Sequence, residues 1–447
     1  MPGPIEDAQG LLAHGQPAEA YAVVRHLLER EPNNLKGHFL AAAAAGRMGR
    51  RAEALDHLGR CRRSLSQGPG QVTGYLQLAR AYERVGAPVE ALGLLESAVR
   101  LAPSETAIRV ELADLLLRQD RYDESATAAR RAASEQPDNA AAWSTLGAAE
   151  HKAGRCDSAL EAYRRAQALK PEWTFLNNNV AAAAIAAGDP DAAIDTARRW
   201  LAAEPGSAEA LSFLALALNE AGRPEEAREL FDFDRLVKCY TFEPPAGFTD
   251  TDAFNDALEA HVLSHPTLKT PRIDEPTWHH PALRISDNLL EGHKGPLESL
   301  EDLMRQAVSR YREDAGGDPR HPFLAHCPDQ VNIIAWAAVL EGEGNQHAHI
   351  HIDGYLSGCY YVRIPPEISS EHNGSDGPIK GGFEIGRPPE EIGCKAEPLT
   401  RAVKPHEGLM VLFPAYLYHQ TIPFKSAARR ICVAFDVLPS GRQRVGH

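Results

Sequence analysis

The chain has 447 residues and a formal net charge of −14, and at about 150 residues per domain its length allows up to three domains. The acidic balance argues against a nucleic-acid partner, because phosphate binding requires clustered lysine and arginine. Seven cysteines, an odd number without CxxC spacing, predict a reducing cytoplasm rather than a disulfide scaffold. No apolar run reaches about 18 residues, and no basic leader precedes an apolar segment, so we expect neither a membrane span nor secretion.

The first half of the chain repeats with a period of 34 residues. Proline recurs at this interval at Pro69, Pro103, Pro137, Pro171 and Pro205. Residues suited to tight turns recur at Gly15, Gly49, Gly86, Asp120, Gly154, Gly188 and Gly222. A small residue follows each of them five positions later, at Ala20, Ala54, Ala91, Ser125, Ala159, Ala193 and Ala227. This period, with small residues at fixed helical positions, resembles the tetratricopeptide repeat.

The resemblance implies an N-terminal all-α solenoid of about seven helix pairs over residues 1–236. Two helices cross closely only where their side chains are small, and glycine or aspartate permits the turn between them. The match is weakest in the first repeat, where Pro4 interrupts the first expected helix.

This repeat class often binds extended peptides on a concave face built from the first helices of the pairs. Four residues of this chain are candidates for that face, namely Tyr75, Phe175, Asn178 and Asn179. An equally weighted interpretation makes the two asparagines solvated helix residues, and the repeats themselves a scaffold only.

The second half, residues 237–447, has a mixed composition, and no Gly/Ser-rich linker separates it from the repeats. Helical apolar spacing predicts helices over 252–264 and 296–311. Apolar, β-branched and aromatic runs predict strands over 237–242 and 330–340. We therefore expect a β-sheet domain supported by helices.

Polar side chains alternate along the segment His347-Ala-His-Ile-His-Ile-Asp353. In an extended strand, His347, His349, His351 and Asp353 point to one face. Three imidazoles and a carboxylate on one face suggest a metal site. His351 and Asp353 can supply the histidine and the carboxylate of a facial triad, whose third ligand is a distant histidine. His419, at the end of a second expected strand, is the candidate for it.

The downstream motifs are Leu-Ser-Gly-x-Tyr-Tyr, Gly-x-x-Val-Leu-Phe-Pro, a histidine, and Arg-Ile-x-Val-Ala-Phe. Together with His-x-Asp they resemble the Fe(II)/2-oxoglutarate oxygenases, closest to a bacterial branch related to prolyl hydroxylases. The resemblance implies a double-stranded β-helix, a jelly-roll or cupin-like fold. It also implies His351, Asp353 and His419 as iron ligands. Arg430 matches the residue that pairs with the distal carboxylate of 2-oxoglutarate, and Tyr361 matches a second cosubstrate contact.

Three alternatives stay open. In one, His349 and His351 supply the ligands, and Asp353 lies beside them without binding the metal. In another, the strand is shifted by one residue, and Tyr360 takes the role of Tyr361. In the third, the barrel binds a metal without catalysis, as some cupin-like proteins do.

The implied reaction consumes 2-oxoglutarate and O₂ at Fe(II), hydroxylates a substrate carbon, and is stimulated by ascorbate. We expect a protein or peptide substrate recruited by the repeats. The alternatives are a small-metabolite oxygenase whose repeats serve assembly, and a non-catalytic metal-binding scaffold. The sequence does not set the oligomeric state.

Overall fold

The chain forms two compact units in a computed structural model, Met1–Leu176 and Asn177–His447. Helix α11 (Phe175–Ala187) spans the division between them. Within these units, the structure describes residues 3–65, 71–270, 283–342, 344–369 and 379–441.

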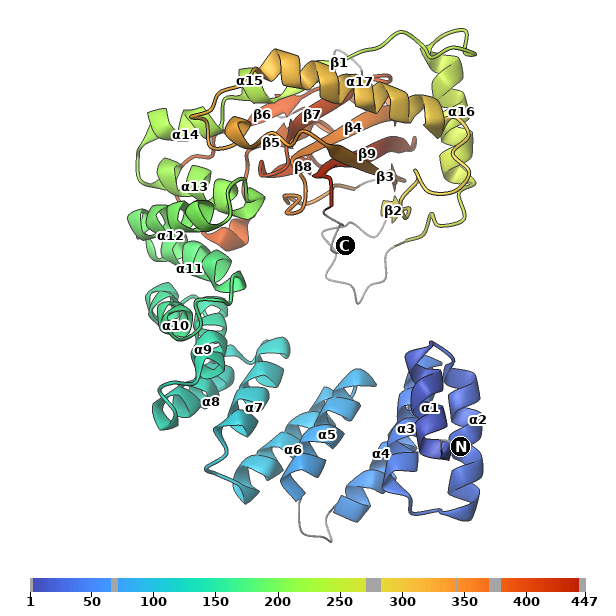
Figure 1. Ribbon diagram of the computed structural model, residues 1–447, viewed down its shortest axis with the longest axis vertical. Coiled ribbons are helices and arrows are strands. Elements are labelled where there is room, and N and C mark those ends of the chain that lie inside the picture. The colour runs from blue at the N-terminus through green and yellow to red at the C-terminus, as the bar shows by residue number, and fades with distance from the viewer. Residues whose placement is uncertain (1–2, 66–70, 271–282, 343, 370–378, 442–447) are drawn as a thin grey trace. The chain divides into compact units, whose positions relative to one another are not determined.

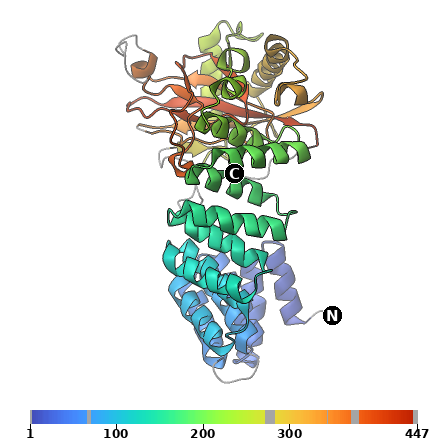
Figure 2. The ribbon, with the colours of Figure 1, turned by 90° about the vertical axis from the view of Figure 1, so that its left-hand side faces the viewer.

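Fourteen helices in the described part of the first 230 residues form seven consecutive helix-turn-helix pairs, as the 34-residue period predicts (Figure 1). The helices are α1 (Pro4–Ala13), α2 (Pro17–Arg30), α3 (Leu35–Arg47), α4 (Arg51–Leu65), α5 (Gln71–Arg84), α6 (Pro88–Leu101), α7 (Thr106–Arg118), α8 (Tyr122–Glu135), α9 (Ala140–Lys152), α10 (Cys156–Leu169), α11 (Phe175–Ala187), α12 (Pro190–Ala203), α13 (Ala208–Glu220) and α14 (Pro224–Leu230). In the first unit the helices stack in chain order (Figure 2). One expectation was wrong: Pro4 starts α1 instead of interrupting it, because a first-turn proline has no amide hydrogen to leave unbonded.

The seven predicted turn residues all have a positive φ, between 55° at Asp120 and 79° at Gly188. Asp120 is the one non-glycine residue with positive φ in the described part of the chain, and aspartate is among the few residues that tolerate this conformation. The small residues five positions later are completely buried, as the close crossing of the helices requires. Pro69 of the proline series lies outside the described residues.

The second half is an antiparallel β domain with supporting helices, so the predicted fold class is confirmed. Its elements are α15 (Phe233–Leu236), β1 (Lys238–Tyr240), α16 (Thr251–Leu263), β2 (Leu283–Ile285), α17 (Leu297–Ala315), η1 (Leu324–His326), β3 (Val331–Leu340), β4 (Leu356–Arg363), α18 (Pro366–Ser369), β5 (Phe383–Ile385), η2 (Glu390–Ile392), β6 (Arg401–Val403), β7 (Met410–Pro414), β8 (His419–Thr421) and β9 (Arg430–Pro439). The larger sheet has the order β1-β7-β4-β9-β3-β2, and the smaller sheet has the order β6-β5-β8.

The two sheets meet through aromatic side chains. The ring of Phe383 on β5 lies 5.2 Å from that of Phe413 on β7, and His419 on β8 lies 4.7 Å from Phe413. Helix α17 lies across the larger sheet (Figure 1), and its Tyr311 hydroxyl donates to the carbonyl of Leu236 at 2.9 Å. The site between the sheets is therefore enclosed by a packed apolar shell.

All seven cysteines are free thiols. None of the described helices combines the length and the apolar character needed to cross a membrane.

Candidate metal centre

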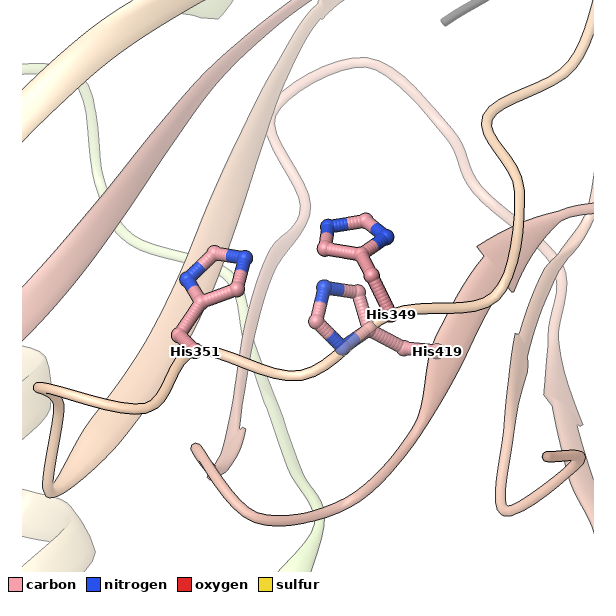
Figure 3. A group of neighbouring side chains, drawn as sticks. All are labelled: His349, His351 and His419. Atoms are coloured by element: carbon pink, nitrogen blue, oxygen red, sulfur yellow. The ribbon is translucent and has the colours of Figure 1, made fainter. Parts of the chain in front are cut away.

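Three histidine rings converge between the two sheets (Figure 3). One ring nitrogen of each of His349, His351 and His419 lies within 4.8 Å of the others. The ring centroids are 4.2 Å apart for His349 and His419, 4.9 Å for His351 and His419, and 5.1 Å for His349 and His351. All three side chains are at most 9% exposed. It is the one group of metal-ligating side chains of this kind found among the described residues.

Backbone pairing sets this geometry. His349 and His419 face each other as an antiparallel bridge, in which each amide donates to the other carbonyl at 3.2 and 3.0 Å. Residues directly opposite in such a pair hold their side chains side by side. His351 lies two positions further on, and its amide donates to the carbonyl of Ala415 at 3.1 Å. The expected strand ending at His419 was wrong, because β8 begins at this residue.

The Nδ1 atoms of two of the rings are hydrogen-bonded to backbone carbonyl oxygens. Nδ1 of His349 lies 2.7 Å from the carbonyl of His347, and Nδ1 of His419 lies 3.1 Å from that of Leu417. A carbonyl oxygen only accepts, so Nδ1 carries the proton and the lone pair is on Nε2, which is the tautomer that can bind a metal through Nε2. Burial and the neighbouring His351 hold the pKa of His419 well below its ordinary value, so this imidazole is neutral near pH 7.

A buried carboxylate orients the third ring. Asp436, on β9 and 2% exposed, accepts from Nδ1 of His351 and from the Ser357 hydroxyl, the latter at 2.8 Å. Trp336 packs against the same imidazole at 5.6 Å. Sequence analysis missed Asp436, although a carboxylate within an apolar strand is itself a signal, because a buried charge must have a partner.

Asp353 lies outside the three-histidine group. The expected continuous strand from His347 to Asp353 was wrong, because the chain turns after His351, where the Gly354 amide donates to the His351 carbonyl at 3.3 Å. His347 is exposed. Asp353 is half-buried. Burial raises the pKa of the Glu209 carboxyl on α13, and the charges of Glu204 and then of Asp353 raise it further.

A second polar group lies on the inner face of β4 and β9. The guanidinium of Arg430 stands 5.2 Å over the ring of Tyr361, and Arg430 is 3% exposed. Its Nη1 donates to the Cys432 thiol at 3.7 Å, while its Nε is buried without a hydrogen-bond partner among the described residues. The buried Tyr361 hydroxyl has the Cys359 thiol beside it, which is only a weak hydrogen-bonding group. No carboxylate pairs with Arg430 within the described ranges. Tyr360 faces the other way, and its hydroxyl donates to Asn255 at 2.9 Å.

The predicted groove residues have mixed surroundings. Phe175 is 53% exposed and stacks on Trp173 with ring centroids 5.6 Å apart. Asn178 donates to Asn179 at 3.4 Å, and both are half-buried on α11. Tyr75 packs against the hydrophobic core of the first unit.

Comparison with known families divides the chain in the same way. Residues 334–436 match a family described as "Putative 2OG-Fe(II) oxygenase". Residues 72–115, 110–172 and 184–232 match tetratricopeptide-repeat families. No curated protein sequence matches the chain.

Solved structures similar to this chain include repeat proteins. A MamA protein has 19% identity and a TM-score of 0.34, covering 36% of this chain and 88% of its own. A tetratricopeptide-repeat protein from Parabacteroides merdae has 16% identity and a TM-score of 0.37, covering 51% and 90%. YrrB, described as having an unusual peptide-binding site, has 20% identity and a TM-score of 0.31, covering 39% and 88%. TM-scores this low support no conclusion about binding.

The buried carboxylate provides a test of the metal centre. We expect Asp436→Asn to weaken Mn(II) binding to the metal-free protein by about 10-fold or more, because the amide no longer supplies the negative charge behind His351. Calorimetric titration measures this affinity. The matched control is Asp314→Asn, which alters a carboxylate that accepts from the Tyr240 hydroxyl at 3.0 Å. Equal affinities in the two variants would show that Asp436 does not support a metal ligand.

Proposed function

Because the chain joins tetratricopeptide repeats to a 2OG-Fe(II) oxygenase domain, we propose that it is an Fe(II)- and 2-oxoglutarate-dependent dioxygenase. We further propose that it hydroxylates a protein or peptide. One observation carries the proposal: a buried arginine, whose Nε has no hydrogen-bond partner among the described residues, lies against a buried tyrosine in the same barrel as three convergent histidines. Such atoms are costly unless a ligand completes them.

The metal ligands in this proposal are His349, His351 and His419. Imidazole nitrogens suit iron, and the ligands leave coordination positions for other molecules. In this set no carboxylate binds the metal directly. The negative charge is instead provided by Asp436, which accepts a hydrogen bond from Nδ1 of the ligand His351. The ligand set His351, Asp353 and His419 remains a prediction. It would require the turn that carries Asp353 to rearrange.

Arg430 and Tyr361 hold the cosubstrate in this proposal. A guanidinium matches a carboxylate through two parallel hydrogen bonds, and the 2-oxoglutarate carboxylate would neutralise a cation that burial leaves without a counter-charge. Burial raises the pKa of the Tyr361 hydroxyl well above its ordinary value, so it stays protonated and can donate to the same carboxylate.

When bound, Fe(II) with 2-oxoglutarate and O₂ couples decarboxylation of the cosubstrate to oxidation of a substrate C–H bond. The chain itself orients and shields the site. Phe383 and Phe413 pack at 5.6 and 4.7 Å from His419, and Trp336 packs beside His351. These rings exclude water from the ligands and fix their orientation.

A peptide substrate suits the exposed aromatic stack of Phe175 on Trp173. An exposed ring of this size gives an extended polypeptide an apolar anchor, and tethering by the repeats raises the local concentration of the target residue at the iron. We place the enzyme in the cytoplasm, where its seven free thiols remain reduced.

Alanine substitutions separate the two ligand sets. We expect His349→Ala, His351→Ala and His419→Ala each to abolish Fe(II) binding and 2-oxoglutarate turnover, because each removes one of three ligands. Asp353→Ala should keep both. Metal titration and succinate release measure the two properties, with circular dichroism to confirm folding. Loss of iron in Asp353→Ala together with retention in His349→Ala would assign the carboxylate to the metal instead.

Neighbouring arginines test the cosubstrate pocket. We expect Arg430→Met to raise the apparent KM for 2-oxoglutarate more than about tenfold, since the lost charge-assisted pair is buried. Arg429→Met is the matched control, because Arg429 is half exposed and pairs with Glu341 at 3.1 Å. Succinate release against cosubstrate concentration gives both constants. A raised KM in Arg429→Met alone would mean that the cosubstrate meets the other face of β9.

Mass spectrometry of a lysate incubated with the enzyme, Fe(II), 2-oxoglutarate and ascorbate tests the substrate class. We expect a polypeptide to gain one oxygen, and Phe175→Ala to reduce that product several-fold while leaving substrate-free 2-oxoglutarate turnover unchanged. Val89→Ala is the control, because Val89 is a 76% exposed apolar residue away from the aromatic stack. Oxygen gained by a metabolite instead would favour the small-molecule alternative, and turnover by no variant would favour a binding protein.

A further inference from the structure

Helix α13 of the last helix pair contacts the oxygenase domain within the second unit. The Glu220 carboxylate, at the end of α13, accepts from the amides of Lys395 at 2.9 Å and Ala396 at 2.8 Å. Asn219 donates to the carbonyl of Glu397 at 3.0 Å. The loop after η2 is therefore held on α13 by charge-assisted hydrogen bonds at its backbone.

That loop leads directly back to a proposed metal ligand. It follows β5, which pairs with β8 so that Ile385 lies opposite His419. The Gly386 amide donates to the carbonyl of Tyr418 at 2.6 Å, and Gln420 donates to Glu384 at 2.6 Å. The strand that carries His419 is thus bonded on one edge to β5 and, through it, to the loop that Glu220 holds.

Two tyrosines in the segment just before His419 are hydrogen-bonded to the same helix pair. The Tyr416 hydroxyl donates to the carbonyl of Leu230, the last residue of α14, at 2.6 Å. The Tyr418 hydroxyl is hydrogen-bonded to Ser212 of α13, which is 3% exposed. The last helix pair of the repeats therefore contacts the connection into β8 at two places, and it reaches β8 indirectly at a third, through the loop that Glu220 holds and β5.

We propose that the last helix pair, α13–α14, positions His419 in the metal centre, and that Glu220 is the main positioning residue. The inference rests on the proposed function, because it assumes that His419 binds the metal. Arg430 and Tyr361 lie on β9 and β4 of the larger sheet, where Glu220 makes no contact. Loosening the Glu220 loop should therefore weaken metal binding without altering the binding of 2-oxoglutarate.

The test compares three full-length variants. Glu220→Ala removes both acceptors, whereas Glu220→Gln keeps the one oxygen that receives both amides. Glu225→Ala is the matched control, because Glu225 is 86% exposed and pairs only with Arg228 among the described residues. Each variant is titrated with Mn(II), melted without metal, and assayed at saturating Fe(II) for its Michaelis constant toward the cosubstrate.

We expect Glu220→Ala to bind Mn(II) about fivefold more weakly or worse, with a KM for 2-oxoglutarate within about twofold of wild type. Glu220→Gln should recover most of the affinity, and Glu225→Ala should match the wild type. If Glu220→Ala does not fold, Asn219→Ala and Tyr418→Phe should show the same selective loss of Mn(II) affinity to a smaller degree.

Wild-type Mn(II) affinity in a folded Glu220→Ala protein would overturn the inference. It would also be overturned if Glu220→Ala weakened Mn(II) binding and raised the KM for 2-oxoglutarate by the same factor, and Glu220→Gln restored neither. When Glu220→Ala is unfolded, wild-type affinity in both Asn219→Ala and Tyr418→Phe overturns it. A wild-type chain that binds no Mn(II) would instead refute the metal centre, and this inference with it.

Discussion

The pair of backbone hydrogen bonds between His349 and His419 is the constraint on which the metal centre depends. It joins two segments that lie far apart in the chain, and it sets their imidazoles opposite each other. Each bond is worth only about 1 kcal/mol net, so the bridge alone cannot fix the rings. The surrounding contacts do so: β5 pairs with the far edge of β8, and Phe413 packs against the His419 ring.

The charges around the site have a functional rather than a stabilising arrangement. Three imidazoles are neutral when Nδ1 alone carries the proton, and Asp436 provides one negative charge through His351. Arg430 is buried without a counter-charge in the described part of the chain, which costs several kcal/mol before any ligand binds. Departures of this kind from the rules of core packing are expected where a protein binds something. An anionic cosubstrate would recover that cost, whereas folding alone would not.

Local chemistry explains which features the sequence predicted. The residue at each tight turn between paired helices adopts positive φ, which favours glycine and tolerates aspartate. Gly154 and Asp120 therefore predict the turns of the helix pairs from the sequence alone. Strand β3 follows from a long apolar run that only Asn332 interrupts. The turn after His351 had a local signal in the Asp353-Gly354 dipeptide, which is typical of turns, but the alternating histidines favoured a strand, and the Ala415 carbonyl that receives the His351 amide lies on a distant segment. Asp436 stands out in the sequence as a carboxylate within an apolar strand, but its partner Ser357 is identified only once β9 and β4 are paired.

The last helix pair shows why no flexible linker separates the two halves. A solenoid must cover the apolar face of its terminal repeat, usually with a polar capping helix. In this chain ten of the thirteen residues of α13 are buried, from Ala208 to Leu218, so no polar face is left for solvent. The neighbouring β domain covers that face, and Tyr416 and Ser212 make polar contacts there. The boundary predicted at 236/237 remains a prediction, but a cut at that position would expose both the end of the solenoid and the support of β8. The last repeat therefore contacts the segment that leads into β8, the strand that begins with His419.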